Sequence, residues 1–109
     1  MIDGLMWQDD IQTQTVKKDW RGTKTYCRNL QLDGYSDWRV PDITELRTIL
    51  DRSRSPKIRK EFRYGRAYLY WASTVYGDGS LFSYYVRFND GGSGFGNNKV
   101  DGYVRCVRE

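Results

Sequence analysis

Few side chains of the kinds that usually carry out catalysis occur in this chain of 109 residues. It contains no histidine, so it lacks both the commonest general base and the commonest metal ligand. Asp37 and Arg39 flank Trp38, where an acid and a cation could form a catalytic pair or a structural ion pair. We favour a structural ion pair or a hydrogen bond within the turn, because the chain has no histidine and no second carboxylate can be placed beside Asp37. We therefore expect no enzyme activity, no metal site and no cofactor.

The two cysteines, Cys27 and Cys106, lie far apart, and neither belongs to a Cys-x-x-Cys motif. This spacing argues against a zinc site or a thioredoxin-type site. Two interpretations remain open on the residues alone: two buried free thiols or one disulfide. A disulfide that closes a loop of this length would stabilise the fold by about 4–5 kcal/mol, and it would indicate an oxidising compartment.

The strongest change of composition lies in residues 52–66, which we call the Arg-rich loop. This segment carries seven basic side chains against one acid, Glu61, and its serines and proline indicate a loop. The planar fork of donors on an arginine suits sulfate, phosphate and carboxylate groups. The alternative is a solvated, mobile loop with no partner. The residues that we predict to bind a polyanion are Arg59, Lys60, Arg63 and Arg66.

A second candidate surface lies in the last third of the chain, which is rich in Tyr, Asn, Ser and Gly. This mixture is typical of antibody combining sites, where rigid aromatic rings supply area and small polar groups supply adaptable hydrogen bonds. The alternative is an ordinary exposed hairpin face. The predicted ligand-binding residues, which we call the late-chain surface, are Tyr84, Tyr85, Arg87, Asn89, Asp90, Asn97, Asn98 and Lys99.

Two helices are expected to position these surfaces. Apolar residues at helical spacing predict a helix over residues 16–31, which Asp33-Gly34 would end as a C-cap. A second helix is predicted over residues 43–51. Asp42 and Glu45 fit a capping box at its start.

The rest of the chain is expected to form strands and loops. A hairpin turn is predicted over residues 76–80, between two alternating segments. Strands are predicted over residues 2–7, 68–76, 81–89 and 100–108, and loops over residues 9–15 and 90–98.

Length and charge limit the classes of protein that fit. The chain is long enough for one domain, residues 1–109, with one modest core. The net charge of +4 weakly favours anionic partners but is low for a dedicated nucleic-acid binder. No run approaches the ~20 apolar residues of a membrane span. No signal peptide is visible either, so we expect a cytosolic protein or a domain whose targeting segment lies upstream.

Several short motifs occur in a fixed order along the chain. They are Leu5-Met6-Trp7-Gln8, the set Trp20, Tyr26, Cys27 and Leu30, the run Gly34-Tyr35-Ser36-Asp37-Trp38-Arg39-Val40-Pro41 with Glu45-Leu46 behind it, Tyr70-Trp71-Ala72-Ser73-Thr74, Phe88 with Gly91, and Tyr103-Val104-Arg105-Cys106-Val107-Arg108. In this order and spacing the motifs resemble the Lcl C-terminal domain family, a bacterial family largely of unknown function. The resemblance covers nearly the whole chain.

The resemblance implies a C-type-lectin-like fold of the α+β class. Two helices would pack on a small twisted antiparallel sheet, with the N- and C-terminal strands adjacent. It also implies a disulfide from the first helix to the last strand, which selects the bridge between Cys27 and Cys106. Family members are commonly exported, so an extracellular, cell-surface or periplasmic location is expected. The chain lacks the Glu-Pro-Asn or Gln-Pro-Asp triplet of calcium-dependent sugar sites.

We therefore expect a non-enzymatic domain of a bacterial surface or exported protein. It would bind a macromolecule, either a polyanionic glycan or a protein, through the late-chain surface and the Arg-rich loop. The alternative is a structural or oligomerising head of a longer surface protein, with no ligand of its own. That alternative makes a homo-oligomer the second expected partner, and nucleic acid is not expected.

Overall fold

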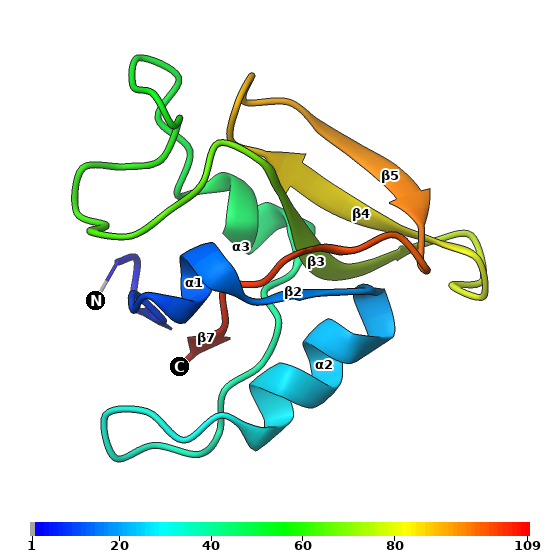
Figure 1. Ribbon diagram of the computed structural model, residues 1–109, viewed down its shortest axis with the longest axis horizontal. Helices are drawn as coiled ribbons and strands as arrows, with labels where there is room; N and C mark the ends of the chain where they lie inside the picture. The colour runs from blue at the N-terminus through cyan, green and yellow to red at the C-terminus, as the bar shows by residue number, and fades with distance from the viewer. Residues whose placement is uncertain (1) are drawn as a thin grey trace.

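Helices occur only in the first half of residues 2–109, the part of the chain that the computed structural model describes, and the second half contains strands (Figure 1). The helices are α1 (Gln12–Thr15), α2 (Trp20–Asn29) and α3 (Ile43–Arg47). The strands are β1 (Met6–Trp7), β2 (Lys17–Lys18), β3 (Leu69–Tyr76), β4 (Phe82–Arg87), β5 (Ser93–Asn97), β6 (Gly102–Tyr103) and β7 (Val107–Arg108). Over this described range, none of the helices has the length and apolar character that crossing a membrane requires.

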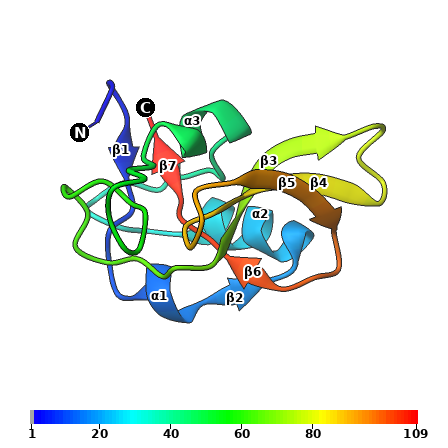
Figure 2. The same ribbon diagram turned by 90° about the horizontal axis from the view of Figure 1, so that it is seen from above.

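The two ends of the chain lie side by side (Figure 2). β1 pairs antiparallel with β7, so that Trp7 lies opposite Val107. A disulfide joins Cys27 in α2 to Cys106 just before β7, with 5.6 Å between the two Cα atoms. The expected α+β class, the adjacent terminal strands and the bridge between Cys27 and Cys106 are therefore confirmed.

The second sheet contains five strands in the order β2-β6-β3-β4-β5. β3, β4 and β5 follow one another antiparallel, as consecutive strands joined by short turns usually do. β6 lies between β2 and β3; it is antiparallel to β2 and parallel to β3. In this arrangement Tyr103 lies opposite Lys17 on one side and Tyr70 on the other. Lys17, Tyr70 and Tyr103 are far apart in the sequence but thus lie side by side on three adjacent strands.

Two clusters of buried side chains hold the helices and sheets together. The smaller cluster surrounds the disulfide and consists of Cys27, Trp38, Val40, Val104 and Cys106. The larger cluster lies between α3, the strands and the Arg-rich loop, and it consists of Trp7, Leu46, Ile49, Ile58, Phe62, Tyr70, Ala72, Val86, Phe88 and Val107. The Arg-rich loop therefore contributes to the main core.

Helix α2 is shorter than the predicted range of residues 16–31. It begins after Asp19, whose carboxylate accepts the N–H of Gly22 at 2.7 Å, and it ends before Leu30. A Cβ at Gly22 would lie 2.9 Å from Asp19 Oδ1 and 3.0 Å from Lys18 Cβ. Gly22 lowers the intrinsic helix propensity of this segment. Its missing side chain, however, leaves room for the Asp19 carboxylate to cap the helix. Residues 17–18 form β2 instead.

Two predictions about the neighbouring turns are also wrong. Asp33 and Gly34 do not cap α2 but form the turn between Leu32 and Tyr35. Their φ angles are +56° and +81°, the conformation of a two-residue hairpin turn. Residues 12–15, expected in a loop, form the single helical turn α1.

The strands differ from the prediction mainly near the end of the chain. β3 and β4 are confirmed, but residues 93–97, expected in a loop, pair with β4 as β5. Gly94 and Gly96 allow this, because a Cβ at either would lie 3.2 or 3.1 Å from the Tyr85 side chain. The strand expected over residues 100–108 is two strands, β6 and β7, which belong to different sheets. The first expected strand is confined to β1.

Helix α3 begins at the predicted capping box. The Asp42 carboxylate accepts the N–H of Glu45 at 2.7 Å, and Glu45 accepts the N–H of Asp42 at 2.9 Å. Arg39 donates to both carboxylate oxygens of Glu45 at 2.8 Å. The helix ends at Arg47, earlier than predicted. The N-terminal cap of α3 is nonetheless held by the two hydrogen bonds of the capping box and by the ion pair of Glu45 with Arg39.

The ion pair between Arg39 and Glu45 predicts a pH dependence of stability. The hydrogen bond from Arg39 holds the pKa of Glu45 below its ordinary 4.5. A carboxyl group with a depressed folded pKa stabilises the fold above its unfolded pKa, and this contribution is lost as the pH falls through the folded pKa. We expect Glu45→Gln to lower the free energy of unfolding by about 1 kcal/mol near neutral pH. Denaturant unfolding should show that the difference in unfolding free energy between the variant and the parent shrinks below pH 4.5. A difference that stays constant with pH would contradict a stabilising ion pair between Arg39 and Glu45.

Candidate ligand-binding surfaces

The Arg-rich loop is attached to the body of the domain at several points. Ile58 and Phe62 are buried in the main core. The carboxylate of Asp9 accepts the backbone N–H groups of Arg63 and Tyr64, each at 2.9 Å. Such contacts restrict the backbone from which the basic side chains project. The loop is therefore a packed segment and not a detached one.

A buried cation, Arg105, lies at the centre of this attachment and is 1% exposed. Its guanidinium donates to the carbonyl of Gln8 at 2.6 Å and to the carbonyl of Tyr64, and it lies 3.4 Å from Asp9. Loss of hydration lowers the pKa of Arg105, and the Asp9 carboxylate is among the groups that oppose this shift. Arg105 thus joins the N-terminal segment, the Arg-rich loop and the C-terminal segment. No local pattern in the sequence indicates this role.

The charge of Arg59, one of the four predicted polyanion-binding residues, is partly neutralised within the protein. Its guanidinium lies 2.9 Å from the Glu61 carboxylate and 3.8 Å from that of Asp3. A bound anion would compete with these acids. Arg59 is therefore the least available of the four.

The other three predicted residues are exposed. Arg66 donates to the carbonyl of Gln14 at 3.1 Å, which places its side chain and leaves further donors open. Within residues 2–109, the side chains of Lys60 and Arg63 form no hydrogen bond or ion pair. Lys60, Arg63 and Arg66 are thus exposed cations that an anion could contact. Arg52 and Arg54 of the same loop are exposed as well, and each donates one hydrogen bond at 3.0 Å, to the carbonyls of Gly91 and Ile58.

The late-chain surface does not form one face. Tyr84 and Tyr85 are neighbours in β4, so their side chains leave opposite faces of the sheet. The ring of Tyr84 lies 6.1 Å from that of Phe95, whereas the ring of Tyr85 lies 5.8 Å from that of Trp71. One flat ligand therefore cannot contact both tyrosine rings.

The polar residues of the late-chain surface lie at the two ends of β5, roughly 13 Å apart for a strand of this length. At the first end, Asp90 pairs with Arg87 at 3.2 Å and accepts the N–H of Gly92 at 2.8 Å. The hydrogen bonds from Gly92 and Arg87 hold the pKa of Asp90 below its usual range. Asn89 is exposed beside them. At this end of β5, most polar groups of the turn therefore form hydrogen bonds with one another and are not free to bind a ligand.

At the second end of β5, Asn98 is buried. Its side chain accepts a hydrogen bond from the Ser83 hydroxyl at 2.7 Å and donates to the Gly79 carbonyl at 3.2 Å. Asn97 accepts the backbone N–H of Lys99 at 2.9 Å, and both side chains are exposed. Asn98 therefore has a structural role, while Asn97 and Lys99 remain accessible.

The two charged residues around Trp38 do not pair with each other. Asp37 accepts hydrogen bonds from Arg108 at 2.5 and 3.0 Å, and these bonds hold the pKa of Asp37 below its usual range. Arg39 binds Glu45, and it also pairs with Glu109 at 2.6 Å. Both residues thus form ion pairs that hold the C-terminal segment.

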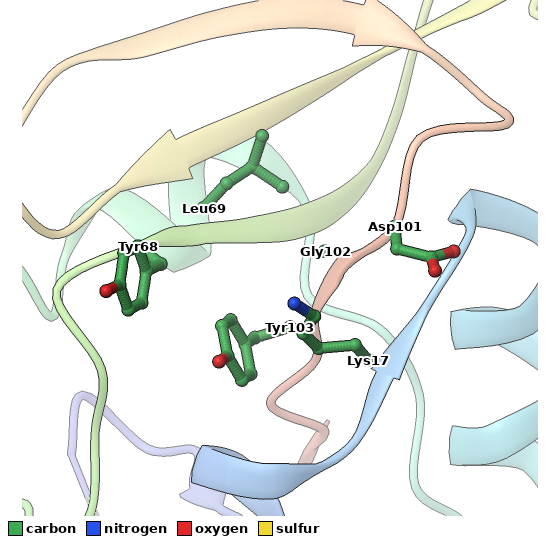
Figure 3. A pocket seen from close by; sticks show the side chains of 6 residues that line it. All are labelled: Lys17, Tyr68, Leu69, Asp101, Gly102 and Tyr103. Carbon is green, nitrogen blue, oxygen red and sulfur yellow. The ribbon is translucent and has the colours of Figure 1, made fainter.

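A cleft that the sequence analysis did not predict lies where β2, β6 and the start of β3 meet (Figure 3). It has a volume of about 420 Å³. The rings of Tyr68 and Tyr103 stack with centroids 6.0 Å apart, and the Lys17 ammonium lies 5.6 Å from the centre of the Tyr103 ring. We call it the tyrosine cleft; its lining consists of Lys17, Tyr68, Leu69, Asp101, Gly102 and Tyr103.

One part of the tyrosine cleft could have been found from the sequence. Tyr68 and Tyr70 alternate at the start of a predicted strand, so they share one face. Lys17, however, lies in the segment that the sequence predicts to be helical. The parallel pairing of Tyr103 with Tyr70 joins residues that are far apart, so no local sequence pattern indicates it. The cleft therefore depends on long-range pairing.

Comparison with known protein families gives a match over almost the full chain. The family model described as the Lcl C-terminal domain matches residues 2–108. A comparison with curated proteins found no match. The Arg-rich loop, the late-chain surface, the tyrosine cleft and both cysteines all lie within the matched region.

Proposed function

The chain belongs to the Lcl C-terminal domain family, and from this premise we propose that it is a non-enzymatic domain that binds a polyanionic glycan. One observation carries the proposal: the Arg-rich loop presents exposed Lys60, Arg63 and Arg66 from a backbone that Asp9 and Arg105 hold in place. A binding segment ordered in advance loses less conformational entropy when its ligand binds.

The location that fits this proposal lies outside the cytoplasm. The disulfide between Cys27 and Cys106 is buried, and disulfides persist mainly in oxidising compartments. We place the domain in the periplasm, at the cell surface or in the extracellular medium of a bacterium. We propose glycans that carry sulfate or uronate groups as the ligands there.

The late-chain surface has a smaller part in the proposal than the sequence suggested. Asn98 is used inside the protein, and Arg87 is paired with Asp90. Asn97 and Lys99 stay exposed at one end of β5. We propose them as peripheral contacts and place the main binding energy in the Arg-rich loop.

Heparin is a suitable probe of this proposal. We expect the protein to be retained on a heparin column at low salt and released as salt rises, because ion release drives such binding. Replacing Arg59, Lys60, Arg63 and Arg66 together by Ala should abolish retention.

A matched control removes the same number of charges elsewhere. Lys18, Arg21, Arg28 and Arg47 are exposed basic residues outside the Arg-rich loop, and their replacement by Ala should leave most of the retention intact. Equal losses in both variants would show that net charge alone drives binding, and would contradict a site in the loop.

The alternative function, an oligomerising head, is favoured by one observation. Tyr76 and Phe95 stack at 4.0 Å although they are 44% and 47% exposed, and Leu81 nearby is 60% exposed. Apolar surface of this kind often becomes buried on association. A molar mass that rises with concentration in sedimentation, together with no retention on heparin, would select this alternative over the proposed function.

A further inference from the structure

We propose that the tyrosine cleft binds an uncharged pyranose ring of a glycan. This site is separate from the Arg-rich loop, and its existence does not depend on polyanion binding there. Three features of the cleft carry the inference: a fixed aromatic platform, a rim of polar groups without partners, and a shape that depends on one glycine.

The platform consists of the rings of Tyr68 and Tyr103, which lie on the same side of the strands (Figure 3). The planes of the two rings differ by 19°. Tyr103 also stacks on the buried ring of Tyr70 at 5.5 Å, which fixes its position from within. Tyr68 is 58% exposed, so its ring is available to a ligand. The negative face of an aromatic ring suits the apolar C–H face of a pyranose.

Polar groups surround this platform. The ammonium of Lys17, the carboxylate of Asp101 and the phenol hydroxyls of Tyr68 and Tyr103 form no hydrogen bond or ion pair in the described part of the chain. They offer both donors and acceptors, which matches sugar hydroxyls, since these also donate and accept. One cation and one anion leave the cleft without net charge. The cleft therefore differs in ligand preference from the Arg-rich loop.

The shape of the cleft depends on Gly102. A Cβ at this position would collide with Leu69 Cδ2 and would lie 2.9 Å from the Trp71 ring. Glycine therefore allows β6 to approach the start of β3 closely, which sets the distance between the two segments that carry Tyr103 and Tyr68. The volume of about 420 Å³ falls within the range of sites that bind small ligands.

Chemical-shift mapping by NMR tests this proposal directly. The ¹⁵N-labelled protein would be titrated with three neutral hexasaccharides: maltohexaose, cellohexaose and the hexamer of N-acetylglucosamine. We expect at least one of them to shift the amide signals of Lys17, Leu69, Gly102 and Tyr103. These shifts should persist at about 1 M salt, where charges are screened beyond about 3 Å. No shifts with any of the three sugars, or shifts confined to another surface, would overturn the proposal.

Variants separate the role of the ring from general effects on folding. Tyr68→Ala should weaken binding of the responding sugar by about tenfold, the lower end of the effect that removing one stacked aromatic ring has on the binding of nucleic-acid bases. Tyr68→Phe keeps the ring and should bind within a few-fold of the parent. Tyr76→Ala removes a tyrosine that is also exposed but lies outside the cleft, and it should not change binding. Binding that survives Tyr68→Ala, or that is lost in Tyr76→Ala, would overturn the proposal.

The two binding proposals fail independently. The variant that lacks the four basic residues of the Arg-rich loop should still bind the neutral sugar, and Tyr68→Ala should still be retained on heparin. Loss of sugar binding in the loop variant would contradict a separate cleft site even if heparin binding behaved as expected.

Discussion

Replacing Cys27 and Cys106 together by Ala should lower the free energy of unfolding by about 4 kcal/mol. The bond joins residues 79 positions apart, and closing a loop of that length stabilises a protein by about 4.5 kcal/mol in the chain-entropy treatment. The whole stability of a domain of this size is about 5–15 kcal/mol. Denaturant unfolding of the variant and the parent, both without reductant, measures the difference.

Packing around the bond needs its own control, because both cysteines are fully buried among Trp38, Val40 and Val104. Val104→Ala shortens a side chain of the same cluster without touching the disulfide and should cost about 1–3 kcal/mol. A double cysteine variant that loses no more than Val104→Ala would mean that the crosslink itself adds little. The C-terminal segment would then be held by the pairing of β1 with β7 and by the contacts of Arg105 and Arg108.

Two features that depend on neighbouring residues were predicted correctly. The capping box of Asp42 and Glu45 is present, because its residues are three positions apart and form the cap themselves. The strands around the hairpin of residues 76–80 are present for the same reason: alternation and a glycine-rich turn act locally. The pairing of the chain ends followed from the family resemblance and not from local pattern.

Features that depend on pairing between distant residues were missed. The tyrosine cleft requires β6 to enter the sheet between β2 and β3, and a strand of two residues gives no periodic signal. The late-chain surface is not a single face, and only part of the reason is long-range. Tyr84 and Tyr85 lie on opposite faces because neighbouring residues of a strand alternate. The pairing of residues 93–97 with β4, where a loop was expected, separates Asp90 from Lys99.

The same limit applies to Arg105. A lone arginine in a predicted strand looks like a surface residue, because arginine is almost never fully buried without partners. Its partners, the carbonyls of Gln8 and Tyr64 and the carboxylate of Asp9, come from two other segments. Only the folded chain shows that they surround one guanidinium.

Arg105→Met should be among the most destabilising single substitutions outside the disulfide, with a loss of about 3–5 kcal/mol in the free energy of unfolding. Methionine fills much of the volume but donates no hydrogen bonds. The buried carbonyls of Gln8 and Tyr64 would lose their donor, and Asp9 would lose the charge opposite it. Arg105→Lys keeps the charge but cannot reproduce the planar fork, so denaturant unfolding should give it an intermediate loss.

Arg108→Met supplies the matched control three residues further along the chain. Its ion pair with Asp37 is partly exposed: the Asp37 side chain is 63% exposed and that of Arg108 is 15% exposed. Arg108 also lies 3.6 Å from the centre of the Tyr35 ring. We expect a loss of about 1–2 kcal/mol from the ion pair and this cation–π contact, which is less than for Arg105→Met. If both methionine variants lost the same stability, the buried network around Arg105 would not be the special feature that the contacts indicate.

The Arg105 variants also connect the fold to the proposed binding. Arg105 is buried and cannot touch a polymer, yet it holds the carbonyl of Tyr64 between two of the exposed cations, Arg63 and Arg66. When this anchor is lost, the Arg-rich loop must become ordered as the ligand binds, and the entropy cost lowers affinity. Under conditions where the variant stays folded, Arg105→Met should therefore leave the heparin column at lower salt than Arg108→Met, although both have lost one positive charge. The reverse order would show that charge at the surface matters and that the attachment of the loop does not.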